Sequence, residues 1–157
     1  MFALRKAVLD DIPQIWEVRG QAIKVGCRKH YSEEDIQRWA SVPLYPEFPT
    51  VVEQTDFYVI ADTRRIAAFG FLDQRKSEIG AMFVHPEFQA LGFGRRILST
   101  LEGIARQSAL SSLSLIATLN AERFYSAAGF RSQARTKWKH PNGFELDCVP
   151  MNKELLA

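Results

Sequence analysis

A strand, a glycine-containing turn and a helix start follow one another between Glu78 and Arg96, and this stretch constrains the fold most strongly. Its first part, 79–84, is apolar and rich in strand-forming residues. Pro86 then stops the strand, because proline has no N–H to donate to a strand ladder. Gly92 and Gly94 come next, before an apolar pattern of helical spacing. The first N–H groups of a helix have no internal partner and carry partial positive charge, so the stretch predicts an anion-binding turn.

Two common nucleotide-binding signatures do not fit this turn. The dinucleotide fingerprint needs a third glycine, and Arg96 or Ile97 stands where it is expected. The P-loop needs Gly-Lys-Ser/Thr, which does not follow. Taken alone, the turn also fits a tight loop closing onto a helix. Arg95 and Arg96 place positive charge beside the glycines and favour a negatively charged ligand.

Two motifs carry a resemblance to a known family. Gln89-x-x-Gly92-x-Gly94 resembles the acetyl-coenzyme A signature of the GNAT acetyltransferases, Gln/Arg-x-x-Gly-x-Gly/Ala. A second block, 119–130, resembles the family's downstream motif of an asparagine, an aromatic residue with a tyrosine, and Gly-Phe. The blocks occur in the family's order and at its usual separation. The resemblance implies an α/β (α+β) GNAT fold, in which a mixed, mostly antiparallel sheet of about seven strands is flanked by helices.

The remaining pattern extends this expectation over the whole chain as one domain, 1–157. We expect Asp10 to cap the first helix, Ser32 the second and Asn120 the last, with Gly129 ending the last helix. A short helix is expected near Val51. Strands are expected at 2–8, 57–61, 66–72, 77–84, 112–117, 130–139 and 144–151, and helices at about 12–26, 32–40, 94–108 and 120–128. The resemblance implies that the fourth and fifth strands, 77–84 and 112–117, splay apart around the cofactor.

Composition narrows the class of protein. A chain of 157 residues with 46% hydrophobic and 24% charged residues has the balance of a soluble domain. Its net charge of +2 is too small to favour nucleic acid, and we expect no signal peptide, membrane span or metal site. Cys27 and Cys148 lack metal-ligand spacing, so we expect thiols in a reducing cytoplasm.

The resemblance implies acetyl-coenzyme A as the acyl donor. It places the pyrophosphate on the N–H groups of 91–95 and an oxyanion donor near Phe83 or Val84. Asn120 is expected to cap the helix, to contact the cofactor, or both. The expected cofactor-binding residues are Met82, Phe83, Val84, Gln89, Ala90, Leu91, Gly92, Phe93, Gly94, Arg95, Asn120, Phe124 and Tyr125.

Acetyl transfer to an amine needs a base for the amine and an acid for the departing thiolate. Glu78 lies eleven residues before Gln89, as in family members that use a glutamate base. The alternative is an exposed glutamate at a strand start, with His30, His85 and Asp147 in reserve as bases. Tyr125 is the expected acid; the alternative is a tyrosine that only packs against its aromatic neighbours.

The acceptor site is expected between the first two helices, the loop after them and the last hairpin. Trp16, Arg19, His30, Tyr31 and Trp138 lie there, as does Trp39. The resulting hypothesis is an N-acetyltransferase acting on a primary amine of a small molecule or peptide by direct transfer in a ternary complex. The alternatives are a non-catalytic acyl-coenzyme A sensor and a protein or aminoacyl-tRNA acetyltransferase. The sequence leaves open whether the chain forms a homodimer.

Overall fold

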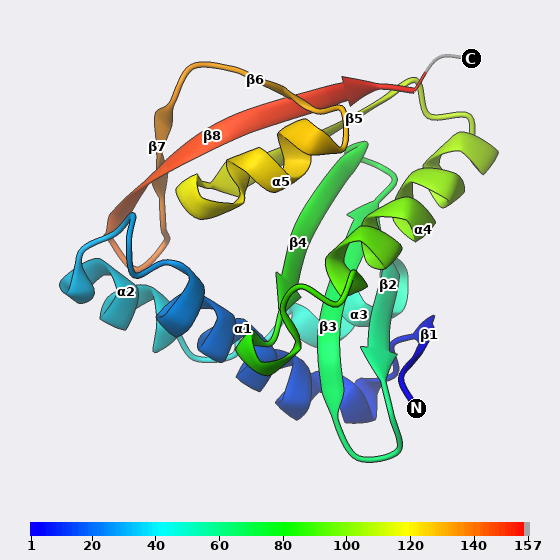
Figure 1. The fold of residues 1–157 in the computed structure, drawn as a ribbon, viewed down its shortest axis with the longest axis horizontal. Coiled ribbons are helices and arrows are strands. Elements are labelled where there is room, and N and C mark those ends of the chain that lie inside the picture. The colour runs from blue at the N-terminus through cyan, green and yellow to red at the C-terminus, as the bar shows by residue number, and fades with distance from the viewer. Residues whose placement is uncertain (156–157) are drawn as a thin grey trace.

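The computed structural model describes residues 1–155, which form an open eight-stranded sheet with helices on both faces (Figure 1). The strands are β1 (Ala3–Lys6), β2 (Asp56–Ala61), β3 (Ile66–Asp73), β4 (Glu78–Val84), β5 (Ser112–Thr118), β6 (Arg131–Ser132), β7 (Thr136–Lys139) and β8 (Glu145–Glu154). The helices are α1 (Ile12–Gly26), α2 (Glu33–Ala40), α3 (Phe48–Gln54), α4 (Phe93–Gln107) and α5 (Glu122–Ala127), with short 3-10 helices η1 (Leu9–Asp11), η2 (Pro86–Phe88) and η3 (Leu119–Ala121).

The sheet order is β1-β2-β3-β4-β5-β8-β6, with β7 also paired to β8. All pairs are antiparallel except β4 with β5, so the sheet is mixed and mostly antiparallel, as the resemblance implied. Helix α4 covers one face of the sheet through a stripe that includes Ile97 and Leu101, and α5 adds Tyr125 to the same cluster. Helices α1 and α3 cover the other face around Phe57 and Phe69. Burial of apolar surface in these two clusters therefore holds both layers onto the sheet.

The parallel pair β4–β5 is joined at one end and open at the other. Glu78 and Ser114 are the only registered pair between the two strands among the described residues, and the Ser114 N–H donates to the Ser77 carbonyl at 2.9 Å. Beyond that point the strands diverge in Figure 1. The expected splay between the fourth and fifth strands is therefore present.

A β-bulge at Gly80 accompanies this divergence. In the pairing of β3 with β4, Phe71 faces Ala81 and Leu72 faces Ile79, so Gly80 is an extra residue on β4. A Cβ at Gly80 would lie 2.2 Å from the Phe71 ring, which only glycine avoids. Bulges bend the strand that carries them, so this one turns β4 locally where it leaves β5.

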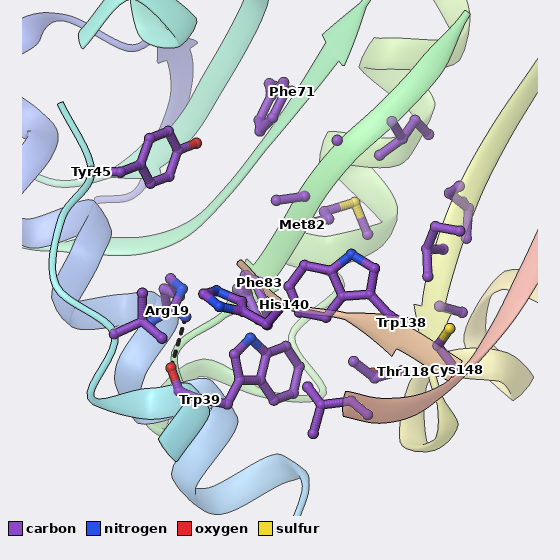
Figure 2. A pocket seen from close by; sticks show the side chains of 18 of the residues that line it. Arg19, Trp39, Tyr45, Phe71, Met82, Phe83, Thr118, Trp138, His140 and Cys148 are labelled. Atoms are coloured by element: carbon purple, nitrogen blue, oxygen red, sulfur yellow. Dashed lines mark hydrogen bonds between the residues drawn. The ribbon is translucent and has the colours of Figure 1, made fainter. Parts of the chain in front are cut away.

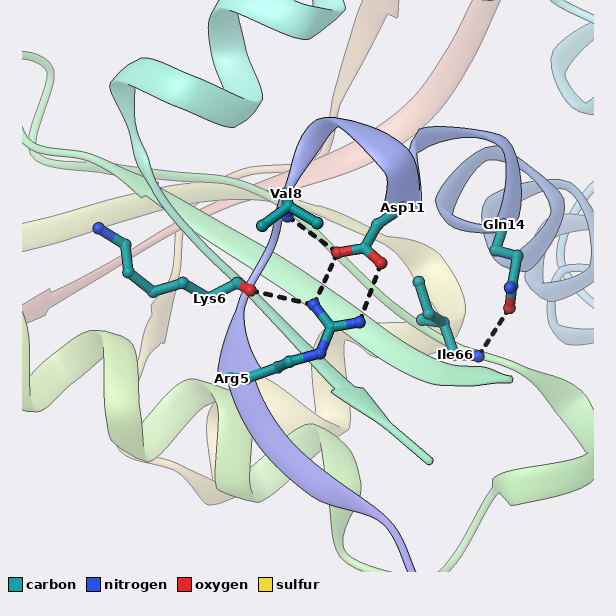
Figure 3. A network of polar contacts seen from close by, with 6 residues as sticks. All are labelled: Arg5, Lys6, Val8, Asp11, Gln14 and Ile66. Atoms are coloured by element: carbon teal, nitrogen blue, oxygen red, sulfur yellow. Dashed lines mark hydrogen bonds and ion pairs between the residues drawn. The ribbon is translucent and has the colours of Figure 1, made fainter. Parts of the chain in front are cut away.

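The start of α1 differs from the sequence-based expectation. Asp10 was expected to be the cap, but Asp11 is the N-cap residue and Asp10 lies in η1. The Asp11 carboxylate accepts a bidentate pair of hydrogen bonds from Arg5, at 2.7 and 2.9 Å, and a third from the Val8 N–H at 2.8 Å (Figure 3). Asp11 thus ties β1 to the entrance of α1. Nearby, Gln14 accepts a hydrogen bond from the Ile66 N–H at 2.9 Å and ties α1 to β3.

The last expected hairpin is only partly regular. The turn at 140–143 is present, with Gly143 at φ +91°. The single strand expected at 130–139 is instead divided into β6 and β7, both paired with β8. This division raises the strand count from the expected seven to eight.

Both cysteines are buried free thiols, as the sequence analysis favoured. Within residues 1–155, no helix has both the length and the apolar character needed to cross a bilayer.

Candidate active site

The opening between β4 and β5 continues into a cavity of about 840 Å³ (Figure 2). One part of its wall comes from β4 between Glu78 and Phe83 and from β5 and its end, 115–118. The other part comes from α1, α2, the segment 42–48 and the last hairpin. The cavity therefore connects the gap between the strands with the region where an acceptor site was expected. Its lining is mainly aromatic and aliphatic, as in small-molecule sites generally.

Backbone groups of β4 face this gap without strand partners. The His85 N–H bonds to the Ala67 carbonyl of β3 at 2.8 Å, and the register pairs Phe83 with Phe69. Because N–H groups alternate in direction along a strand, Phe83 also points its N–H at β3, whereas Met82 and Val84 point theirs at the gap. Of the two N–H groups expected to serve as oxyanion donors, only that of Val84 faces the gap.

The glycine turn precedes α4, which begins at Phe93 rather than after Gly94. Gly92 is the N-cap residue with φ +82°, a left-handed conformation that side chains disfavour, and Ala90 is also left-handed at φ +62°. A second hollow of about 470 Å³ lies beside this turn. Its lining consists of Leu4, Gly92, Arg95, Arg96, Ser99 and Thr100. The helix N-terminus and two arginines thus share one concave surface, which suits an anion.

The remaining residues of the signature have structural contacts. The Gln89 side chain donates to the Val84 carbonyl at 3.0 Å and so closes the loop onto the end of β4. A Cβ at Gly94 would lie 3.4 Å from Phe124 and 3.5 Å from Val84. The space around Gly94 is therefore filled by protein, whereas, its own residue and chain neighbours aside, no protein atom lies within 4 Å of a Cβ built at Gly92.

Tyr125 on α5 is buried and lines the cavity. Its ring packs edge-on against Phe124 and Phe130, with centroid distances of 5.1 and 5.8 Å. Burial raises the pKa of the Tyr125 phenol, so the hydroxyl stays protonated at physiological pH and is able to donate. Tyr125 therefore packs against its aromatic neighbours and also reaches the cavity.

Glu78 is half-buried at the start of β4 and lines the same cavity. The reserve bases are less well placed. His30 is exposed, and neither His30 nor His85 contributes to the cavity wall. Asp147 does, but its ion pair with Lys137 at 2.7 Å lowers the pKa of the carboxyl and makes it a weaker base.

Four of the five expected acceptor-site residues line the cavity: Trp16, Arg19, Tyr31 and Trp138, while His30 does not. The Tyr31 hydroxyl donates its one proton to the Asp147 carbonyl at 2.5 Å and accepts from the Leu119 N–H at 3.0 Å. These two hydrogen bonds hold the Tyr31 side chain in the wall of the cavity. Trp39 also lines the cavity and packs edge-on to Tyr31.

Asn120 does not cap α5. It lies in η3, and the N-cap residue of α5 is Ala121, which makes no side-chain cap hydrogen bond. The Asn120 amide oxygen instead accepts a hydrogen bond from the Cys27 thiol at 3.4 Å, which joins η3 to the end of α1. Its side chain does not contribute to the cavity wall.

Sequence reasoning missed several parts of the wall. His140 was assigned only to a turn, yet its ring lines the cavity, stacks on Phe144 at 4.5 Å and packs edge-on to Trp138. Cys148 also lines it and was not expected to, whereas the segment 42–48, which lines it as well, is the loop after the first two helices that the sequence analysis included. The only sequence signal for this role was the clustering of aromatic residues on either side of the final turn.

Comparisons with known proteins agree with this architecture. A family model described as an acetyltransferase (GNAT) domain matches residues 27–155. No curated protein sequence matches the chain significantly. Among solved structures, a GCN5-related N-acetyltransferase from Rhodopseudomonas palustris is similar with a TM-score of 0.88 at 23% identity, covering 98% of this chain and 95% of that one.

Two further structures resemble this one at lower identity. The PaiA N-acetyltransferase from Thermoplasma acidophilum, solved with coenzyme A, has a TM-score of 0.76 at 17% identity over 98% of this chain and 99% of that chain. The ribosomal-protein-S18-alanine N-acetyltransferase from Escherichia coli has a TM-score of 0.68 at 18% identity over 100% and 96%. At these identities, the likeness establishes the fold.

The splayed mixed sheet and the glycine turn before α4 define an acyltransferase fold. The chain belongs to the GNAT acetyltransferase family, since the family model covers most of its length.

Proposed function

We propose that this protein transfers an acetyl group from acetyl-coenzyme A to a primary amine of a small molecule or peptide, by direct transfer in a ternary complex. The observation that carries the proposal is the continuous cavity, which opens between β4 and β5 and extends to the aromatic wall of α1, α2 and the last hairpin. Donor and acceptor bound in its two parts would meet beside Tyr125 and Glu78. Such proximity removes much of the entropic barrier to the reaction.

For the donor, the helix N-terminus at 91–95 would hold the pyrophosphate, supported by Arg95 and the Gly92 conformation. The pantetheine arm would pair with the free backbone groups of Met82, in the way a strand would, because the Val84 carbonyl already accepts a hydrogen bond from Gln89. Gln89, Ala90, Phe93 and Phe124 would shape this site through packing and loop geometry. The N–H of Val84 is our candidate for the donor that stabilises the oxyanion.

For the chemistry, Glu78 would take a proton from the ammonium form of the acceptor, directly or through water. The neutral amine then attacks the thioester carbonyl, a C–N bond forms, and the C–S bond breaks as the tetrahedral intermediate collapses. Tyr125 would donate its proton, or a hydrogen bond, to the departing thiolate of coenzyme A. The amine's remaining surplus proton restores Tyr125 by way of solvent, Glu78 releases its proton to solvent, and acetylated amine and free thiol leave the site, so that one proton is released per turnover.

A thiol-release assay with a panel of small amines and short peptides tests this proposal. We expect release of free coenzyme A that depends on the amine and on acetyl-coenzyme A together, with an N-acetylated product by mass spectrometry. Tight binding of acetyl-coenzyme A without amine-dependent release would favour the sensor alternative. Turnover restricted to folded proteins or aminoacyl-tRNA would favour the third hypothesis.

A further inference from the structure

Arg19 is a buried cation in the wall of the acceptor part of the cavity. Only 8% of the residue is exposed. Its Nη2 donates to the Trp39 carbonyl at 2.9 Å, and its guanidinium lies 4.5 Å from the centre of the Trp16 ring. Its Nη1 is buried and has no hydrogen-bond partner among the described residues. Figure 2 shows the side chain reaching into the cavity beside His140.

Arg19 keeps its positive charge, and no carboxylate among the described residues pairs with it. Burial lowers the pKa of the guanidinium to about 10, which still leaves it cationic at neutral pH. Three carboxylates line the same cavity, Glu47, Glu78 and Asp147. Within residues 1–155, none of them forms an ion pair with Arg19. Burying a cation that has an unused hydrogen-bond donor costs free energy. An anion that accepts a hydrogen bond from Nη1 would therefore bind favourably.

His140 supplies a second donor next to this cation. Its Nδ1 accepts a hydrogen bond from the Asn142 N–H at 3.0 Å, so the proton of the neutral ring lies on Nε2. Partial burial, followed by the charge of Arg19, lowers the pKa of His140, which keeps the ring neutral at physiological pH. His140 is thus suited to donate a hydrogen bond to a ligand oxygen and less suited to act as a base.

We propose that the acceptor amine carries a carboxylate, which the free Nη1 of Arg19 binds inside the cavity. This inference rests on the proposed acetyl transfer and narrows its acceptor to amino acids and related amino carboxylates. The walls formed by Trp16, Trp39 and Trp138 favour an apolar or aromatic body for that acceptor. A phosphonate fits less well, because Arg19 is the only arginine or lysine among the lining residues and a dianion would keep one buried charge unpaired.

Matched acceptor pairs test this inference. We compare phenylalanine, methionine and leucine with phenethylamine, 3-(methylthio)propylamine and isopentylamine, which lack only the carboxylate, and with the corresponding aminophosphonates. We expect kcat/KM to be at least about tenfold higher for the carboxylates, the size of a charge-assisted hydrogen bond. The phosphonates should be poorer than the carboxylates. Equal or better turnover of the uncharged amines or of the phosphonates would overturn the assignment.

Arg19→Met separates recognition from packing, because it keeps an unbranched side chain against Trp16 and removes the charge. It should reduce the ratio of kcat/KM for each carboxylate over that for its matched uncharged amine to about one, whatever the change in absolute turnover. The control Arg28→Met, at an exposed site just after α1, should keep the preference. An Arg19→Met protein that keeps the preference, or loses both acceptor classes equally, would overturn the inference. If the variant does not fold, the wild-type pairs decide.

Failure of the proposed function is distinguishable from failure of this inference. If no amine supports thiol release, acetyl transfer fails, and calorimetry with phenylalanine in the presence of coenzyme A then tests the inference alone. Binding that phenethylamine does not share and that Arg19→Met removes would support a carboxylate site. Equal binding of both compounds, or no binding, would overturn it. Turnover of uncharged amines only would leave acetyl transfer intact and reject the carboxylate.

Discussion

Tyr125 and Glu78 reach the cavity from the two sides of the gap, Tyr125 from α5 beyond β5 and Glu78 from β4. Their environments differ in a way that suits opposite tasks. Tyr125 is buried among aromatic rings, which holds its proton, whereas Glu78 is half-buried at a strand end and open to solvent. A buried donor near sulfur and a solvent-connected carboxylate near the amine would divide acid and base work between them.

Replacing Tyr125 with phenylalanine keeps the ring packing and deletes the hydroxyl. We expect turnover to fall by at least about tenfold, the lower edge of general acid help, with unchanged affinity for acetyl-coenzyme A. Steady-state kinetics and calorimetry measure the two quantities. Tyr58→Phe is the matched control, since Tyr58 does not line the cavity. Normal turnover in Tyr125→Phe would leave Tyr125 as a packing residue only.

Replacing Glu78 with glutamine removes the candidate base but keeps the side-chain size. Turnover should fall by about tenfold or more, and the acidic limb of the pH–rate profile should shift or disappear. Glu53→Gln, on the exposed side of α3, should behave as wild type. A Glu78→Gln enzyme with a normal rate and profile would transfer the role of base to water, since His30 and His85 lie outside the cavity and Asp147 is paired.

At the scale of elements, the site depends on how β4 leaves β5. The strand, the glycine turn and the helix were predictable from local pattern, because alternation, proline and glycine act within a few residues. The Gly80 bulge was not, because it is defined by the register of β4 against β3. The cap of α1 was misplaced by one residue, and the side chain of Asp11 makes no cap hydrogen bond but binds Arg5 on β1, a contact that local pattern does not reveal.

Gly80→Val tests the importance of the bulge. The new side chain would meet the Phe71 ring, which stacks on Phe57 with centroids 5.0 Å apart and also lines the cavity. We expect a loss of about 1–3 kcal/mol in unfolding free energy and a larger fractional loss of turnover, as the ring is pushed toward the acceptor. Gly103→Ala, with open space around it, should be neutral or slightly stabilising. Denaturant unfolding and kinetics that match wild type in Gly80→Val would refute this.

The Arg5–Asp11 pair makes a prediction about pH. Burial opposes the effect, but the hydrogen bonds from Arg5 and Val8 lower the pKa of Asp11 below its ordinary value. A lowered folded-state pKa stabilises the fold above the unfolded-state pKa near 4, and this contribution is lost as pH falls through the folded-state value. Asp11→Asn should therefore cost about 1–3 kcal/mol at pH 7, and the difference from wild type should shrink below about pH 4.

Thermal unfolding of wild type and Asp11→Asn between pH 2.5 and 7 measures this difference. The adjacent Asp10→Asn is the control, because Asp10 is exposed and makes no ion pair among the described residues. A difference that is constant across the range would mean that the charge of Asp11 does not stabilise the fold.

At the scale of the whole molecule, one cavity joins two regions that are distant in sequence. The donor region comes from β4, β5 and the turn before α4, and its motifs were visible in the sequence. The acceptor region gathers α1, α2, the segment 42–48 and the last hairpin, and no local motif predicts which of their aromatic residues meet. For that reason His140 was missed, and His30 was included although it does not line the cavity. Arg19 was selected as a candidate, but its unused Nη1 is visible only in the packed structure.

The most direct test of the account is residue-resolved amide hydrogen exchange, measured by NMR with and without saturating acetyl-coenzyme A. If the cofactor lies in the gap, exchange should slow by about tenfold or more at Met82, Val84 and the amides of 91–95. The Phe83 amide should change less, because the register of β4 against β3 already directs its N–H to Phe69 of β3. Protection confined to other parts of the sheet, or no protection at these amides under saturation, would contradict the central claim that the splay between β4 and β5 is the acetyl-coenzyme A site.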